Sequence, residues 1–196
     1  MSNPRSQIQN SKLGKSFTLI EIIIVIAIIG LVIPAVFSII FVILNQQIKI
    51  YRLQQVKKEG DFVISSIENT IKNNTQSIYQ EQALTSEKCG VSEAAYPVEY
   101  SDPGGVNFYF KDKINKWFNY SLEGGKVSSS SADIGMIDLT TDKVTVSNFD
   151  ISCARNSIYS PATISLSLTI AYQTSSTRVE ETAVMTYNTK INLKSY

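Results

Sequence analysis

The chain of 196 residues contains no histidine, and this single absence removes several kinds of chemistry. Serine and cysteine nucleophiles commonly take their base from histidine, and the common zinc and non-haem iron sites use it as a ligand. A histidine switch that titrates near neutral pH is excluded as well. No other catalytic constellation or phosphate-binding loop is recognisable. We therefore expect no enzymatic activity and no cofactor.

Cysteine is nearly absent too, since the sequence has only Cys89 and Cys153. The two positions do not have the spacing of a metal site. In an exported domain, an even number of cysteines allows one disulfide, here closing a loop of about 64 residues and contributing roughly 4 kcal/mol in the chain-entropy model. Two buried free thiols are the alternative interpretation.

Strong charge of one sign is also lacking, because the formal net charge is +1. Three of the 18 basic side chains, Arg5, Lys12 and Lys15, lie in the first 16 residues. The remainder carries 15 basic against 17 acidic side chains, a net charge of −2. This is not the basic footprint of a nucleic-acid-binding protein, so we expect no nucleic-acid partner.

A long apolar run that begins with one acid is the most informative feature that is present. Ile22 to Leu44 is roughly long enough to span a bilayer, and Glu21 stands at its start. A charge deep in hydrocarbon costs about 2.5 to 3.5 kcal/mol on insertion scales, so Glu21 needs a positive partner. The nearest candidate is the free amine that a cut just before Phe17 creates.

This start resembles a known processing signal. The residues are Phe17-Thr18-Leu19-Ile20-Glu21, after a short basic leader and before Ile26-Ala27-Ile28-Ile29-Gly30. They resemble the N-terminal signal of type IV pilins and type II secretion pseudopilins. The resemblance implies that a membrane aspartic peptidase removes the leader on its cytoplasmic side and methylates the new N-terminal Phe17. It also implies an assembly platform in the inner membrane and other pilin or pseudopilin subunits as partners, with lipid around the helix before assembly.

Two residues depart from the family pattern. Ser16 stands immediately before the expected cut, where the family usually has glycine, and the nearest glycine is Gly14. A cut after Gly14 leaves Lys15 as the terminus and moves Glu21 two residues further from the amine, so we favour the bond between Ser16 and Phe17. The other departure is Pro34, about one helical turn earlier than the usual helix proline.

Gly30 and Pro34 weaken the helix locally. Proline has no amide hydrogen, so the helical bond from residue 34 to the carbonyl of Gly30 cannot form. Either this is a tolerated kink, as in many transmembrane helices, or the segment bends or partly unwinds when subunits pack into a filament, as the resemblance implies.

Two ordinary kinds of membrane segment are the alternatives. A cleaved secretory signal fits poorly, because its apolar region is usually about 7 to 15 residues and no small-residue cleavage site follows Leu44. A plain single-pass anchor explains the length but not Glu21. In each reading the basic leader keeps the N-terminus cytoplasmic, so we expect one span of the cytoplasmic membrane and an extracytoplasmic C-terminal domain.

The expected domain order is a leader (1–16), a transmembrane or filament-core helix (17–44), an amphipathic helix continuing it (45–79) and a β-rich head domain (80–196). The apolar face of the second helix is predicted at Leu44, Ile48, Tyr51, Val56, Val63, Ile67, Ile71 and Ile78. The polar face is predicted at Lys49, Arg52, Lys57, Lys58, Glu59, Glu68 and Lys72. Gly60-Asp61 interrupts this pattern and is a candidate bend.

In the head domain, 80–105 reads as an irregular connection because it is rich in turn formers. A β-hairpin is predicted for Val106–Lys111 and Lys116–Leu122. Ser128–Ser131 is predicted to be a polar loop. Three more strands are predicted at Lys143–Cys153, Ala162–Gln173 and Val179–Leu193, the last two joined by a hairpin at Thr174–Thr177. We assign most of the aromatic side chains of the first hairpin to packing: Phe108, Tyr109, Phe110, Trp117 and Tyr120.

The fold class predicted is therefore α+β, with one long N-terminal helix packed on a largely antiparallel sheet, a pilin-like layout. The order of elements is similar to that of the minor pseudopilins of the J type. Some pseudopilins use calcium, but Asp133, Asp138, Asp142 and Asp150 match no calcium loop, so we interpret them as surface carboxylates and expect no metal site.

Three functions from different classes remain open. The first is a minor pilin or pseudopilin, a structural filament subunit, and it predicts a mature N-terminus at Phe17. A membrane-anchored extracytoplasmic binding domain that does not polymerise is the second, and it predicts an intact leader. An exported enzyme is the third, and it lacks a recognisable catalytic constellation.

Overall fold

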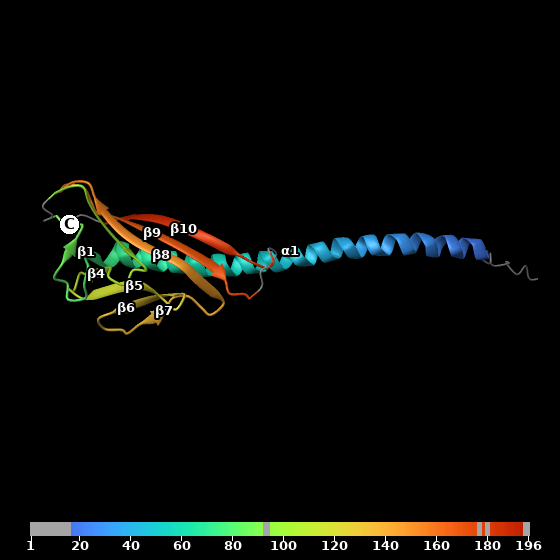
Figure 1. The fold of residues 1–196 in the computed structure, drawn as a ribbon, viewed down its shortest axis with the longest axis horizontal. Helices are drawn as coiled ribbons and strands as arrows, with labels where there is room; N and C mark the ends of the chain where they lie inside the picture. Colours follow the sequence, from blue (N-terminus) through green and yellow to red (C-terminus); the bar gives the residue numbers. More distant parts are fainter. Residues whose placement is uncertain (1–16, 92–94, 176–177, 179–180, 194–196) are drawn as a thin grey trace, which may run out of the picture. The chain divides into compact units, whose positions relative to one another are not determined.

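The computed structural model describes residues 17–91, 95–175, 178 and 181–193 (Figure 1). These residues form one helix, α1 (Leu19–Asn74), and two antiparallel sheets, which confirms the α+β class. The chain divides into two compact units after Leu44, and each is described separately below. The strands are β1 (Thr75–Tyr79), β2 (Glu87–Lys88), β3 (Val98–Pro103), β4 (Tyr109–Asp112), β5 (Trp117–Glu123), β6 (Lys126–Ser131), β7 (Ile137–Asp138), β8 (Val144–Arg155), β9 (Thr163–Tyr172) and β10 (Val184–Asn192).

The two sheets both use antiparallel pairing throughout. One has six strands in the order β2-β1-β4-β5-β6-β7, and the other has four in the order β10-β9-β8-β3. Backbone hydrogen bonds join the sheets where Leu122 of β5 donates to the carbonyl of Gly104, the residue after β3 (2.8 Å), and Val146 of β8 donates to that of Gly125, the residue before β6 (2.8 Å). The core of the β domain lies between these sheets and the second half of α1.

The aromatic hairpin is confirmed as β4 and β5. Phe110 lies directly opposite Phe118 in the register, and the two rings stack with centroids 5.1 Å apart. The turn is held by Asp112, whose carboxylate accepts hydrogen bonds from the amides of Ile114 (2.9 Å) and Lys116 (2.8 Å). Cross-strand aromatic packing and a satisfied turn are what the alternating pattern predicts.

The three late strands are confirmed as β8, β9 and β10, with ends shifted by a few residues. Alternation explains their position, because the side chains of β9 that point inward are Ile164, Leu166, Leu168 and Ile170, all at most 1 % exposed. The predicted start of the last strand, Val179, lies outside the described residues. The strand itself begins at Val184, so the connection from β9 is longer than the predicted hairpin turn.

The predicted end of the long helix is wrong. Helix α1 ends at Asn74, and residues 75–79 are strand β1 instead of a further helical turn. Ile78 misled the prediction, because it is seven residues after Ile71 and thus fits a helical period, yet it also faces the core from a strand. Two successive asparagines, which favour helix ends over helix interiors, mark the boundary.

Two segments predicted to be irregular contain strands. The connection 80–105 holds β2 and β3, and the predicted serine loop is β6. Strand β3 was not predicted because it ends in Pro103. Proline argues against a central strand, but β3 is an edge strand, where proline is tolerated. Strand β6 was not predicted because serine has little intrinsic preference for strands. Ser128 and Ser129 are in a strand because they pair with β5.

The apolar face of the second helix half is confirmed from Val56 onward. Val56, Val63, Ile67 and Ile71 are fully buried. The same face does not extend to the earlier positions, because Ile48 and Tyr51 are 44 % and 59 % exposed. The buried stripe is therefore shorter than the sequence period indicates.

Helix α1 continues through the candidate bend at Gly60-Asp61, and the bend itself stays a prediction. Gly60 is a point of close approach: a Cβ there would lie 2.4 Å from the ring of Tyr187 on β10. Glu59 is likewise not on a solvated face. It is 8 % exposed, and its carboxylate accepts hydrogen bonds from the amide (3.3 Å) and hydroxyl (3.0 Å) of Thr141.

Candidate functional site

The first turn of α1 is closed by a capping box. The helix begins at Leu19, and Thr18 precedes it as the N-cap. The Glu21 carboxylate accepts hydrogen bonds from the Thr18 amide (3.0 Å) and hydroxyl (3.1 Å), and the Glu21 amide donates to the Thr18 hydroxyl (3.4 Å). This reciprocal pair satisfies donors that a helix end otherwise leaves free. The sequence signal was available as Thr-x-x-Glu, but its capping role was not predicted.

Glu21 also occupies a favourable electrostatic position. A carboxylate in the first turn interacts with the positive end of the helix dipole, which typically contributes about 0.3 to 1 kcal/mol. Among the residues that the structure describes, Glu21 has no basic side chain as an ion-pair partner. Its carboxylate is therefore held in place but not neutralised.

The apolar half of α1 is uncovered. Every side chain from Phe17 to Leu44 is exposed, and an 18-residue window reaches a mean hydropathy of 3.1. Within the described residues this is one helix long and apolar enough to cross a membrane. At 1.5 Å per residue, Leu19 to Leu44 measures about 39 Å, more than the roughly 30 Å hydrocarbon core. A long apolar N-terminal helix followed by a β domain fits a membrane-anchored protein.

Gly30 and Pro34 lie inside this uncovered part of α1. The helix continues past both of them. A Cβ on Gly30 would meet no atom within 4 Å, so no packing inside the chain requires glycine there. The functional bend or unwinding of this segment stays a prediction, and so does the tolerated kink.

The predicted processing bond is only partly within view. Ser16, the leader 1–16 and the alternative cut after Gly14 lie outside the described residues. Phe17 and Thr18 are described, and both precede the helix. Cleavage and N-methylation of Phe17 remain predictions.

The two cysteines meet in the β domain. Cys89 and Cys153 form a disulfide with their Cα atoms 6.3 Å apart, linking the segment after β2 to β8. Both are at most 3 % exposed. The bridge therefore ties an edge segment of the six-stranded sheet to a strand of the four-stranded sheet.

The four aspartates considered as calcium ligands, two of which lie in strands β7 and β8, do not gather into a metal site. Asp133 pairs with Lys116 (2.5 Å), while Asp138 and Asp142 both pair with Lys126 (3.2 and 2.6 Å). Asp150 accepts a hydrogen bond from the side-chain amide of Asn148 (2.7 Å). Within the described residues, no group of three or more histidine, cysteine, aspartate or glutamate side chains is arranged to hold a metal ion.

The aromatic residues divide between the two faces of the hairpin. Phe108, Phe110 and Tyr120 are at most 3 % exposed, which confirms packing as the role of most of this group. Tyr109 and Trp117 are half-buried and meet edge to face with centroids 5.8 Å apart.

Polar contacts connect the second half of α1 to β10 and the residues before it. Thr189 donates a hydrogen bond to Glu68, and this bond, with Lys72 nearby, lowers the pKa of Glu68. Tyr187 donates to the carbonyl of Lys57 (3.2 Å), and burial, assisted by the negative charge of Asp61, raises the Tyr187 pKa to about 12.

Arg52 adds further contacts between the second half of α1 and the four-stranded sheet. Its guanidinium lies 5.2 Å from the ring centroid of Tyr172 and pairs with Glu181 (3.6 Å). Together with the contacts to β10, these interactions hold the helix against the four-stranded sheet. Sequence period alone missed them, since it assigned Arg52, Glu59 and Glu68 to a solvated face.

Comparison with known proteins assigns no family to this chain. No family model matches the chain, and no curated protein or solved structure is significantly similar to it. The long apolar N-terminal helix and the antiparallel sheets are consistent with a pilin-like layout.

Proposed function

We propose that this protein is a minor pilin or pseudopilin, a structural subunit of a type IV pilus or a type II secretion pseudopilus. One observation carries the proposal: an uncovered apolar helix has an acid fixed in its first turn, four residues after Phe17. In a plain anchor that acid would serve only as a helix cap. In a filament subunit it would also pair with the amine made by processing.

The capping box supports the processing step. Because Thr18 is the N-cap of α1, Phe17 lies before the helix, so the helix does not enclose the residue that follows the bond to be cut. The prepilin peptidase and methyltransferase of the cytoplasmic membrane would then cut between Ser16 and Phe17 and methylate the new amine. The basic leader keeps this end on the cytoplasmic side.

Assembly uses two interactions with different roles. Burial of the Ile22 to Leu44 surface supplies nonspecific energy, first in lipid and then in a bundle of helices. Pairing of Glu21 with the Phe17 ammonium of an adjacent subunit fixes the axial register. Both capping bonds from Thr18 end on the same oxygen of the Glu21 carboxylate, so the ammonium can pair with the other oxygen without displacing the cap.

The glycine and proline fit the same role. Gly30 leaves a gap on the helix surface, and small residues let helices approach closely in a membrane or a bundle. Pro34 removes the hydrogen bond to the Gly30 carbonyl, which makes this segment the easiest to bend during packing.

The test separates the cap from the charge. Glu21→Gln keeps a side chain that accepts the capping bonds but removes the charge, whereas Glu21→Ala removes both. We expect both variants to be cleaved and to stay in the membrane, and both to be lost from sheared filaments. Mass spectrometry of the first peptide measures cleavage and methylation, and immunoblotting of the filament fraction measures incorporation.

The alternative function gives the opposite results. A membrane-anchored binding domain that does not polymerise predicts a native N-terminus at Met1 and no effect of either Glu21 variant. Normal filament entry by Glu21→Gln would refute the ion pair but not the proposal that the protein is a filament subunit. Ser16→Gly is expected to speed cleavage, and unchanged kinetics would argue against a cut at this bond.

A further inference from the structure

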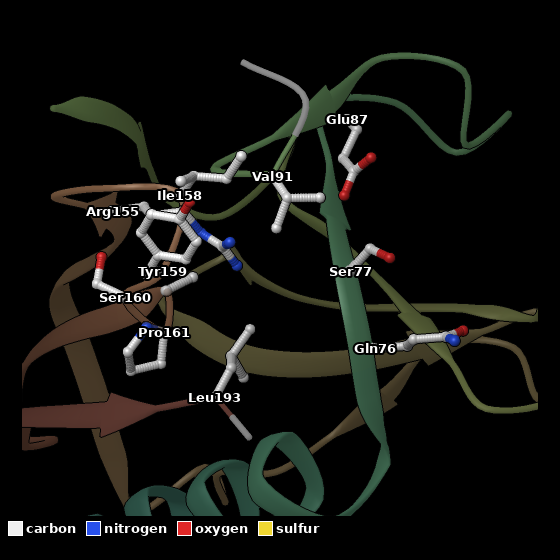
Figure 2. Close-up of a pocket in the computed structure, with 11 residues that line it drawn as sticks. Gln76, Ser77, Glu87, Val91, Arg155, Ile158, Tyr159, Ser160, Pro161 and Leu193 are labelled. Carbon is white, nitrogen blue, oxygen red and sulfur yellow. The ribbon is translucent and has the colours of Figure 1, made fainter. Parts of the chain in front are cut away.

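An open pocket of about 430 Å³ lies between strand β1 and the segment that follows β8 (Figure 2). One wall includes Ser77 of β1, Glu87 and Val91, and the other runs from Arg155 to residue 162. The disulfide joins these walls, because Cys89 lies between Glu87 and Val91 and Cys153 is two residues before Arg155. A covalent link therefore fixes the width of the pocket.

Arg155 provides the unusual polar group of this pocket. Its Nε atom is buried and has no hydrogen-bond partner. The described residues offer its side chain no ion pair either. Figure 2 shows the guanidinium between Tyr159 and Val91, directed toward the open middle of the pocket. A buried donor without a partner is costly, and a ligand acceptor that reaches it removes that cost.

Exposed apolar side chains surround the same opening. Val91 is 57 % exposed, Ile158 50 % and Tyr159 94 %. Exposed apolar groups that gather at a pocket indicate a binding surface, whereas isolated ones do not. An exposed tyrosine beside an arginine is also the composition typical of energetically important interface residues.

The edge of strand β1 is open at this place. Strand β1 pairs with β4 along one side, but β2 covers the other side only at Ile78 and Tyr79. Within the described residues, no strand pairs with Gln76 and Ser77, which line the pocket, on the β2 side of β1. An extended peptide that continues the line of β2 would pair with this edge by strand addition.

We propose that this pocket binds an extended peptide segment of a partner protein by three contacts. A peptide carboxylate pairs with Arg155, an apolar side chain packs on Ile158 and Tyr159, and the peptide backbone pairs with β1. One guanidinium can form a bidentate pair with either a carboxylate or a phosphate, but a carboxylate fits better because Glu87 on the facing wall repels the second negative charge of a phosphate. The carboxylate comes from the peptide C-terminus or from an acidic side chain.

The test uses the full chain in detergent and three fluorescent peptide mixtures. Each mixture has a blocked N-terminus and seven positions, which are drawn from valine, leucine, threonine and phenylalanine except at the middle position of the third mixture. The first mixture ends in a free carboxylate, the second is amidated, and the third is amidated with glutamate at its middle position. Fluorescence anisotropy is expected to show at least tenfold tighter binding of the first or the third mixture than of the second. The tighter of the two identifies the source of the carboxylate.

Variants connect this difference to the pocket. Arg155→Gln is expected to abolish the preference for a carboxylate, while Arg178→Gln, the same change at an exposed site after β9, retains it. Tyr159→Ala removes a side chain that is 94 % exposed, so the fold stays intact while all mixtures bind more weakly. Inorganic phosphate is expected not to compete at millimolar concentration.

Several results would overturn the proposal. Equal binding of the three mixtures, or binding of none, would exclude recognition of a peptide carboxylate. A preference that survives in Arg155→Gln would place the site elsewhere. Competition by phosphate that is stronger than competition by acetate would identify a phosphate site in place of a peptide site.

Discussion

The two halves of helix α1 treat their acidic side chains differently. In the second half, Glu59 and Glu68 have their partners within the chain: Thr141 for the former, Thr189 and Lys72 for the latter. In the first half, the partner of Glu21 among the described residues is the Thr18 cap. The apolar side chains differ in the same way, since Ile67 and Ile71 are fully buried while those from Ile22 to Leu44 are exposed. The second half is buried by its own domain, whereas the first half exposes its apolar side chains, as the proposed packing in lipid and with other subunits requires.

The largest expected difference between the halves is in their contribution to folding. Ile67→Ala removes a fully buried side chain, so we expect the unfolding free energy of the β domain to fall by about 2 to 5 kcal/mol. Ile28→Ala makes the same change at a side chain that is 56 % exposed and is expected to leave that free energy unchanged. Denaturant unfolding of the full chain in detergent, followed by tryptophan fluorescence, measures both. Equal losses would show that the first half also packs on the domain.

Glycine gives a second comparison of intermediate size. Gly60→Ala places a Cβ against the Tyr187 ring, and overpacking of this kind typically costs about 1 to 3 kcal/mol. Gly30→Ala meets nothing, so it is expected to leave the β domain unaffected and to favour the helix by up to about 1 kcal/mol. The unfolding free energy of the two variants checks the first expectation. Gly60→Ala combined with Tyr187→Ala should recover part of the loss, and a lack of recovery would place the cause elsewhere.

The smallest expected effect is the pH dependence of Glu68. The Thr189 hydrogen bond holds its pKa below the ordinary value of 4.5, so its stabilising effect is present above that value and is lost as the pH falls through the lowered pKa. Glu68→Gln should therefore cost under about 1 kcal/mol at pH 7, because the group is partly solvated. The cost should shrink as the pH falls through the lowered pKa and disappear below it. A cost that does not change with pH would mean that the carboxylate charge has no role.

Sequence reasoning worked where one physical rule decided the outcome. Alternation placed β9, since its inward residues are Ile164, Leu166, Leu168 and Ile170, and cross-strand aromatic packing placed the β4–β5 hairpin. It failed where residues distant in sequence determine the local structure. Ser128 and Ser129 form a strand because β5 pairs with them, and Gly60 is required by Tyr187, 127 residues later.

The candidate site was predictable in part. The motif from Phe17 to Glu21 is local, so the sequence located it, although the capping bonds within it were visible only as Thr-x-x-Glu. The pocket at Arg155 was not predictable, because its walls come from β1, the β2 segment and the residues after β8. Only the fold brings these three segments together.

The link between Cys89 and Cys153 also has a consequence for where the chain matures. Thiols in a reducing cytosol remain unpaired, whereas surroundings that accept electrons let them couple. Formation of this disulfide therefore requires that the β domain folds in an oxidising compartment. Molecules isolated with both thiols free would be those that had not yet reached it.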